Sequence, residues 1–174
     1  MIHSLYYKFI LGYLIFGFLG FMTIATFSSD ITYDFLVEQR AESLYDQANL
    51  IADNCSNVYE GKQLDLDAAK PQLEAMASYL SSDIWIVNHG GTITFDSSHR
   101  LTESSIEGFD PTAGGNKPYS IGTYYGMFAY DVLSVSSPIT GNFNTYGYIV
   151  IHMPMSLVTV EQNSILNIVY ITAG

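Results

Sequence analysis

The chain begins with a hydrophobic segment that carries no charged side chain from Phe9 to Ser29. Roughly 20 apolar residues are enough to cross the hydrocarbon core of a bilayer as a helix, so we predict a transmembrane helix over residues 9–29. A cleaved signal peptide is the alternative, because Lys8 provides a basic flank. The apolar run is longer than the roughly 7–15 residues of the apolar core of a signal peptide, and no A-x-A site follows it. We therefore expect an uncleaved anchor, with residues 1–8 in the cytoplasm by the positive-inside rule.

A helical spacing of apolar residues continues after the membrane segment. Intervals of alternately four and three residues are those of the a and d positions of a coiled coil, and they predict a helix from about Asp30 to Tyr59. The seam consists of Val37, Ala41, Leu44, Ala48, Ile51 and Cys55, and Val58 continues it. Two interpretations stay open: the seam packs against the helix's own domain, or it pairs with a second copy in a parallel homodimer. Both hold if the helix uses two neighbouring faces, and a dimer seam would bring two Cys55 thiols within disulfide reach.

A second, shorter helix is predicted after Gly61, a residue that accepts the left-handed conformation of a helix end. Asp67 can cap the free amides of its first turn, and Pro71 is tolerated close to that turn. Its apolar stripe is formed by Leu73, Met76, Ala77 and Leu80. Such a stripe is expected to pack on a sheet.

After Ser82 the pattern changes to short β-branched and aromatic runs that are separated by turn residues, which is typical of strands. The turn Asn88–Gly91 predicts a hairpin, Gly141-Asn142 marks a later turn, and Asp96–Pro118 forms a long loop. The predicted strands are Ile84–Val87, Thr92–Phe95, Tyr119–Tyr125, Met127–Pro138 and Gly147–Met153. Strands in this order need no crossover helices. The fold class is therefore α+β, with a mainly antiparallel sheet of about five strands and the helices on one side.

The C-terminal segment turns helical and apolar again after Pro154, which is tolerated at a first helical position. Residues 163–174 hold an apolar run of about half the length that a membrane span requires. The alternative is a short buried helix, but little else in the chain is expected to bury it, so we predict that these residues begin a second transmembrane helix. The residues between the two spans, 30–162, then form one extracytoplasmic domain.

Charge narrows the choice of partners. The net charge is −11, from 17 acidic residues against six lysines and arginines. Nucleic acid is not expected to bind, because phosphate neutralisation requires basic patches. The acidic residues favour a dispersed, solvated surface over a divalent-cation site.

No motif in the chain carries catalysis. There is no glycine-rich phosphate loop, no asparagine-rich nucleotide box of the kinase kind, and no G-x-S-x-G nucleophile motif. His3, His89, His99 and His152 show no spacing that predicts a metal site. We therefore expect no catalytic residue, metal or cofactor in this chain, and for His152 a structural or ligand-contacting role.

The order of elements and three loose motifs resemble the extracytoplasmic PAS-like sensor domains of bacterial two-pass sensor histidine kinases, which are also grouped as PDC or Cache domains. The motifs are the hairpin Ile84–Asp96, the strand Val132–Ile139 and the segment Tyr146–Pro154 that leads into the last helix. The resemblance extends over essentially the whole chain. It implies a five-stranded antiparallel sheet, a long N-terminal helix that dimerises, a bacterial cell membrane location, and a cytoplasmic kinase of a two-component system downstream.

The resemblance also implies a small-molecule or other envelope signal, and polar groups after the second strand are the candidate contacts. They are His99, Arg100, Tyr119, Tyr124, Tyr125 and Tyr130. The guanidinium of Arg100 could hold a carboxylate or phosphate through two parallel hydrogen bonds. Alternatively, Arg100 is a solvated loop charge and the tyrosines belong to the core or to an interface.

Three other functions stay open. The same sensor could belong to a chemotaxis receptor or to a cyclic-dinucleotide enzyme, and residues after Gly174 would decide between these outputs. The chain could also be a stand-alone membrane-anchored binding protein. An extracytoplasmic hydrolase would need a nucleophile motif that the sequence lacks.

Overall fold

The computed structural model describes residues 2–58, 66–111, 118–141 and 143–158. The chain divides into two compact units, Met1–Val37 and Glu38–Gly174, which we call the first and second units. The segment 163–174, predicted to begin a second transmembrane helix, lies outside the described residues.

The first unit consists of the N-terminal part of helix α1, which runs without interruption over Ile2–Val58. The sequence predicted that the membrane helix continues as a helix to about Tyr59, and the structure has one continuous helix that ends at Val58. Within it, Tyr6–Thr23 is long and apolar enough to cross a membrane, by length and composition, and its side chains are exposed. The predicted bounds 9–29 stay a prediction.

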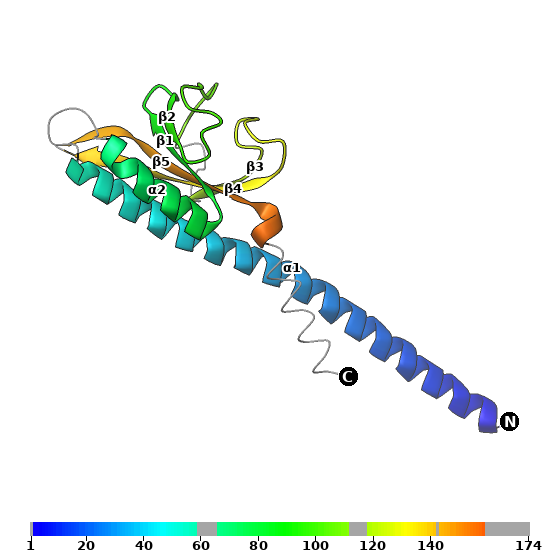
Figure 1. Ribbon diagram of the computed structural model, residues 1–174. Coiled ribbons are helices and arrows are strands. Elements are labelled where there is room, and N and C mark those ends of the chain that lie inside the picture. The colour runs from blue at the N-terminus through cyan, green and yellow to red at the C-terminus, as the bar shows by residue number, and fades with distance from the viewer. Residues whose placement is uncertain (1, 59–65, 112–117, 142, 159–174) are drawn as a thin grey trace. The chain divides into compact units, whose positions relative to one another are not determined.

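The second unit contains a five-stranded antiparallel sheet, as predicted (Figure 1). The strand order is β2-β1-β5-β4-β3. The strands are β1 Asp83–Asn88, β2 Ile93–Asp96, β3 Tyr119–Gly122, β4 Val132–Gly141 and β5 Asn144–Pro154. The two longest strands, β4 and β5, form a hairpin at the centre of the sheet, and β1 pairs with the other side of β5.

The prediction of a strand from Met127 was wrong, because β4 begins at Val132. Tyr124, Tyr125 and Gly126 all have positive φ angles, of 43°, 53° and 76°. A left-handed turn of this kind cannot continue a strand. For the same reason the strand predicted over Tyr119–Tyr125 ends at Gly122.

One face of the sheet is covered by helices. Figure 1 shows α2, which spans Leu66–Leu80, and the second unit's part of α1 along this face. Ser137 of β4 donates a hydrogen bond of 2.6 Å to the Asn49 side chain of α1. Leu73 and Ala77 of the predicted α2 stripe are buried. The helices therefore lie on one side of the sheet, as the sequence predicted.

The predicted seam of α1 is buried within a single chain. Val37, Ala41, Leu44, Ala48, Ile51 and Cys55 each retain 4% or less of their side-chain exposure, without a second copy. Own-chain packing thus accounts for the burial of the seam. Pairing of α1 with a second copy stays a prediction, and it would have to use a neighbouring face of the helix.

The opposite face of the sheet is covered by irregular residues between β2 and β4, of which the structure describes 97–111 and 123–131; we call these residues the covering segment. Alternation along the strands places Trp85 and Val87 of β1 and Val150 of β5 on this face. They form a buried apolar cluster with Ile93, Ile106, Phe128 and Val132, and Leu101, Phe109, Tyr124, Met127 and Tyr148 pack around it. This second core holds the buried polar groups described next.

Candidate functional site

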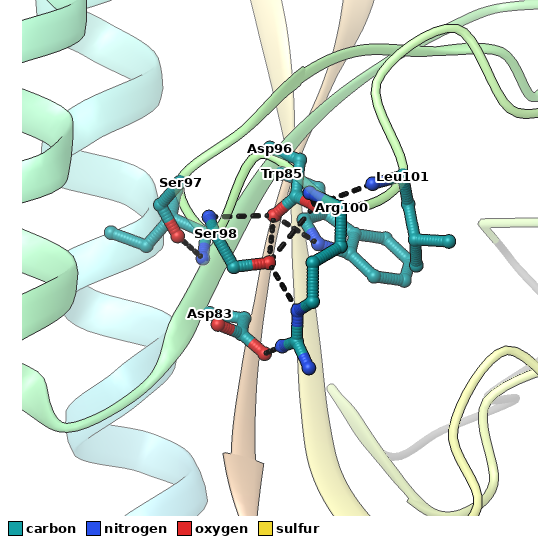
Figure 2. Close-up of polar contacts among 8 residues, drawn as sticks. Asp83, Trp85, Asp96, Ser97, Ser98, Arg100 and Leu101 are labelled. Carbon is teal, nitrogen blue, oxygen red and sulfur yellow. Dashed lines mark hydrogen bonds and ion pairs between the residues drawn. The ribbon is translucent and has the colours of Figure 1, made fainter.

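The carboxylate of Asp96, at the end of β2, organises the first turns of the covering segment (Figure 2). It is fully buried and accepts hydrogen bonds from the backbone amides of Ser98, Arg100 and Leu101 at 2.9 Å. The indole nitrogen of Trp85 donates to it at 3.1 Å, and the Ser98 hydroxyl donates at 2.8 Å. Burial by itself raises the pKa of Asp96, but the hydrogen bonds from Ser98, Leu101 and Arg100 outweigh it and hold the pKa below its usual value. Asp96 is thus a saturated structural carboxylate.

His152 of β5 is the second fully buried ionisable group on this face. Its Nδ1 atom lies 2.8 Å from the hydroxyl oxygen of Ser134 on the neighbouring strand β4. Its Nε2 atom is buried and has no hydrogen-bond partner among the described residues. Burial lowers the pKa of His152 from 6.5 to about 3, although the negative charge of Asp96 acts in the opposite direction. The imidazole is therefore neutral at physiological pH.

Three aromatic rings surround the His152 imidazole. Ring centroids lie 4.2 Å away for Trp85, 4.4 Å for Tyr124 and 5.0 Å for Phe128. Trp85 also stacks on Phe128 at 5.3 Å with an interplanar angle of 8°. Burial, with a smaller effect from Tyr125, raises the pKa of the Tyr124 hydroxyl, so this phenol stays protonated. The result is an aromatic enclosure around one unsatisfied imidazole nitrogen.

A second unsatisfied atom, the hydroxyl oxygen of Ser136, lies on the same face of β4. In the β4–β5 register Ser134 is opposite His152, and Ser136 is opposite Val150. Ser136 and His152 are therefore diagonal neighbours. The Cα atoms of such residues on antiparallel strands are roughly 7–8 Å apart.

The Tyr124–Tyr125 turn covers this face in a strained conformation. For residues other than glycine the left-handed region costs roughly 1–2 kcal/mol per residue, and two consecutive tyrosines occupy it. The Tyr125 hydroxyl donates to the carbonyl of Asp110 at 3.0 Å and accepts from the Asp110 amide at 3.1 Å. The turn is thereby fastened to the segment that follows β2.

The two predicted polar contacts at the start of the covering segment lie in surface ion pairs. The Arg100 guanidinium, 61% exposed, contacts Asp83 at 3.0 Å and Ser98 at 3.0 Å. His99, 65% exposed, lies 3.2 Å from Glu74 of α2. An anion could reach the guanidinium of Arg100 only in competition with Asp83, so its predicted ligand role stays a prediction.

The predicted tyrosines divide between the enclosure and the surface. Tyr124 contacts His152 and Trp85, and Tyr125 packs edge-to-face on Tyr124 at 5.1 Å. Tyr130 is exposed, with its ring 5.7 Å from Phe128, and Tyr119 lies half-buried on the edge strand β3.

Ser136 was not singled out by the sequence, and Trp85 appeared only as a strand residue. Period-two alternation along the strands was the sequence signal that could have identified them. It places four residues on the face opposite the helices: Trp85, Ser134, Ser136 and His152. Among the described residues, no group of three His, Cys, Asp or Glu side chains could hold a metal ion. The arrangement supplies hydrogen bonds and aromatic contacts for binding.

Comparison with known proteins shows the fold. No family model matches the chain, and no curated protein sequence matches it. Among solved structures, it is similar to the sensor domain of the histidine kinase DctB from V. cholerae, with a TM-score of 0.54, 16% identity and coverage of 75% of this chain and 55% of that domain. It is also similar to the E. coli DcuS sensor domain, with a TM-score of 0.51, 17% identity and coverage of 72% and 98%.

A third similar structure is a domain from Vibrio parahaemolyticus assigned to the sensory box/GGDEF family, with a TM-score of 0.52, 15% identity and coverage of 76% of this chain and 63% of that domain. The chain thus spans little more than half of the DctB domain and nearly all of the DcuS domain. The second unit has the PAS-like fold of bacterial sensor domains, as the sequence motifs predicted.

Proposed function

We propose that this chain is the sensing and signal-transducing portion of a two-pass bacterial membrane receptor, with a sensor histidine kinase as the full protein. The observation that carries the proposal is the continuity of α1. The same helix contains the apolar segment Tyr6–Thr23 and, further on, the seam that is buried in the PAS-like unit. A rearrangement of the sheet or of its covering segment would therefore act on the helix whose chain continues into the apolar segment.

The receptor works only if a ligand distinguishes two arrangements of the domain. A ligand that binds both arrangements equally shifts no equilibrium, however tightly it binds. The central strands β4 and β5 offer such a difference, because their residues alternate between two sides. His152 and Ser136 face the covering segment, whereas Ser137 contacts Asn49 of α1. Movement of the β4–β5 hairpin would then displace α1 through this contact.

The Ser134–His152 pair has the distance of a nucleophile and its base, which raises a hydrolase as an alternative. Both residues are almost completely buried, and in the described part of the chain the second imidazole nitrogen contacts no carboxylate that could orient it. A catalytic serine needs such an orienting group and access to substrate. The pair is therefore better suited to ligand binding than to catalysis.

A chimeric receptor tests the sensing role. Residues 1–162 would replace the corresponding part of a histidine kinase of known output, whose own second membrane helix is kept. The chimera would be exposed to a panel of anionic, cationic and uncharged metabolites in cells carrying a transcriptional reporter. We expect at least one compound to change the output, and the Arg100→Ala variant to alter responses to anions only. Constant output across the panel would refute the sensing role.

The output domain is tested separately by the reading frame after Gly174. Continuation into a kinase core supports the proposal, and continuation into chemotaxis-receptor or GGDEF sequence supports the alternative outputs. A stop codon directly after Gly174 would favour an anchored binding protein.

A further inference from the structure

The two buried polar atoms without a partner require a physical explanation. A buried donor or acceptor that forms no hydrogen bond costs roughly 1–3 kcal/mol, and such atoms are rare in native proteins. Here His152 Nε2 and the Ser136 hydroxyl both lack a partner among the described residues, and they lie on adjacent strands of one sheet face. A bound molecule that hydrogen-bonds to both would remove these costs.

The charges around these atoms disfavour an anion. Asp96 keeps its negative charge close to His152. Its two oxygens already accept hydrogen bonds from five donor groups. Among the described residues of the covering segment the basic residue is Arg100, and it is paired with Asp83 at the surface. A buried anion without a paired cation is strongly unfavourable, and a neutral imidazole supplies no positive charge.

The Tyr124 ring covers the His152 imidazole and the Trp85 indole. It lies edge-on to Trp85 at 5.9 Å and to His152 at 4.4 Å, on a turn held in the left-handed region. Strain of this kind is found where a segment changes conformation in function. Release of the turn would move the ring away and relieve the strain, which lowers the free energy needed to open the site.

We propose that this face binds a small, uncharged, planar molecule that displaces the Tyr124 ring and hydrogen-bonds to His152 Nε2 and the Ser136 hydroxyl. The inference rests on the proposed sensing function and adds the class of ligand to it. The neutral imidazole can present either a donor or an acceptor at Nε2, and the hydroxyl can do both. A primary amide or a heterocycle with adjacent donor and acceptor matches this pair, and the aromatic rings match its flat faces.

Binding can be measured with three nearly isosteric probes that differ in charge: benzamide, benzoate and benzylammonium. Trp85 is the only tryptophan of the chain, so its fluorescence in the full chain, held in lipid nanodiscs, reports from the site alone. We expect benzamide to change the Trp85 emission saturably and the two charged probes to bind at least tenfold more weakly. Equal or tighter binding of benzoate, or no Trp85 response to benzamide, would overturn the proposal.

Ser136→Ala separates a binding role from a structural one. Because the hydroxyl has no partner among the described residues, its removal should leave thermal stability unchanged or slightly raised, while benzamide binding weakens roughly threefold to tenfold. The matched control is Ser120→Ala on the edge strand β3, where the side chain is exposed. Unchanged benzamide affinity in Ser136→Ala would show that the ligand forms no hydrogen bond with Ser136 and would refute the proposal.

The pair Tyr124→Gly and Tyr125→Gly tests displacement of the ring. Glycine relieves the left-handed strain in both variants, but only Tyr124→Gly removes the ring beside His152. We expect tighter benzamide binding in Tyr124→Gly and a smaller change in Tyr125→Gly. Weaker binding in Tyr124→Gly would show that the ring is a wall of the site, and would refute displacement. A chimera that responds to metabolites while benzamide fails to bind would leave the sensing role intact and reject only this ligand class.

Discussion

At the residue scale, two buried ionisable side chains on one sheet face differ in charge state: one is ionised and the other is neutral. Asp96 receives enough hydrogen bonds to stay charged, whereas His152 receives one and becomes neutral. The difference follows from position. Asp96 ends a strand where the chain turns back and presents free amides to it, and His152 lies in mid-strand, where backbone amides are already used by the sheet.

Burial of His152 predicts a loss of stability in mild acid. Between pH 6.5 and about 3 the unfolded chain binds a proton at His152 that the folded domain excludes, so the free energy of unfolding falls as the pH falls. From pH 7 to pH 5 this one group contributes a loss of about 2 kcal/mol. Urea unfolding of wild type and His152→Gln at both pH values measures it. The variant should show a smaller loss, and His89→Gln, in the exposed hairpin turn, should behave as wild type; equal losses in all three would contradict the assignment.

Asp96→Asn is expected to destabilise the domain by about 2 kcal/mol or more. Asparagine has one acceptor oxygen where the carboxylate has two, and its NH2 group cannot accept. Either the amides of Arg100 and Leu101 or the amide of Ser98 and the Trp85 indole therefore lose their acceptor. The control Asp83→Asn removes only a partly exposed ion pair and should cost less than about 1 kcal/mol. Thermal unfolding followed by Trp85 fluorescence compares the two. A cost for Asp83→Asn equal to that of Asp96→Asn would show that the surface ion pair, and not the turn, holds the segment.

At the scale of elements, α1 combines two roles that its sequence pattern did not separate. Its heptad-like seam is buried within one chain, so the same residues are not available to a partner helix. The exposed residue Leu50 lies between Asp46 and Asp53 on a different face. A parallel homodimer through this face would place these acids near their copies, and its stability would rise with ionic strength as salt screens the repulsion.

Cysteine cross-linking distinguishes the two faces of α1. Burial raises the pKa of the Cys55 thiol to about 11, and since the thiolate is the reactive form, Cys55 should resist mild oxidation in the folded protein. In a Cys55→Ser background, Leu50→Cys should form a covalent dimer in membranes, with a yield that increases with salt. Non-reducing electrophoresis measures both. A dimer through Cys55 and none through Leu50→Cys would instead make the predicted seam intermolecular.

At the scale of the whole molecule, the proposal requires the second unit to lie outside the cytoplasmic membrane. The positive-inside rule gives this orientation from Lys8 alone, because the described part of α1 has no basic residue between Lys8 and Arg40. The predicted orientation of the chain in the membrane therefore depends on one basic side chain, that of Lys8.

Reporter fusions test this orientation directly. Alkaline phosphatase joined after Gly61 and after Gly115 should be active, and green fluorescent protein at the same positions should be dark when exported through the Sec pathway. The same fusions carrying the Lys8→Glu substitution test whether Lys8 determines the orientation. Loss of its positive charge should reduce the fraction of chains that insert in the predicted orientation. Activity of only the cytoplasmic reporter at both positions would reverse the orientation.

The sequence by itself determined the elements whose signal is periodic and local. The apolar run, the α1 seam, the α2 stripe and the alternating strands each identify a buried face, and their order gave the α+β class and the antiparallel sheet. It failed between Tyr124 and Tyr130, where tyrosines adopt left-handed backbone angles that local preference assigns to glycine or asparagine. Only the tertiary structure decided that the α1 seam is buried within its own chain and that Arg100 pairs with Asp83. Only it brought Ser136 of β4 and His152 of β5 together beside Trp85, because pairing across strands depends on register between segments that are distant in sequence.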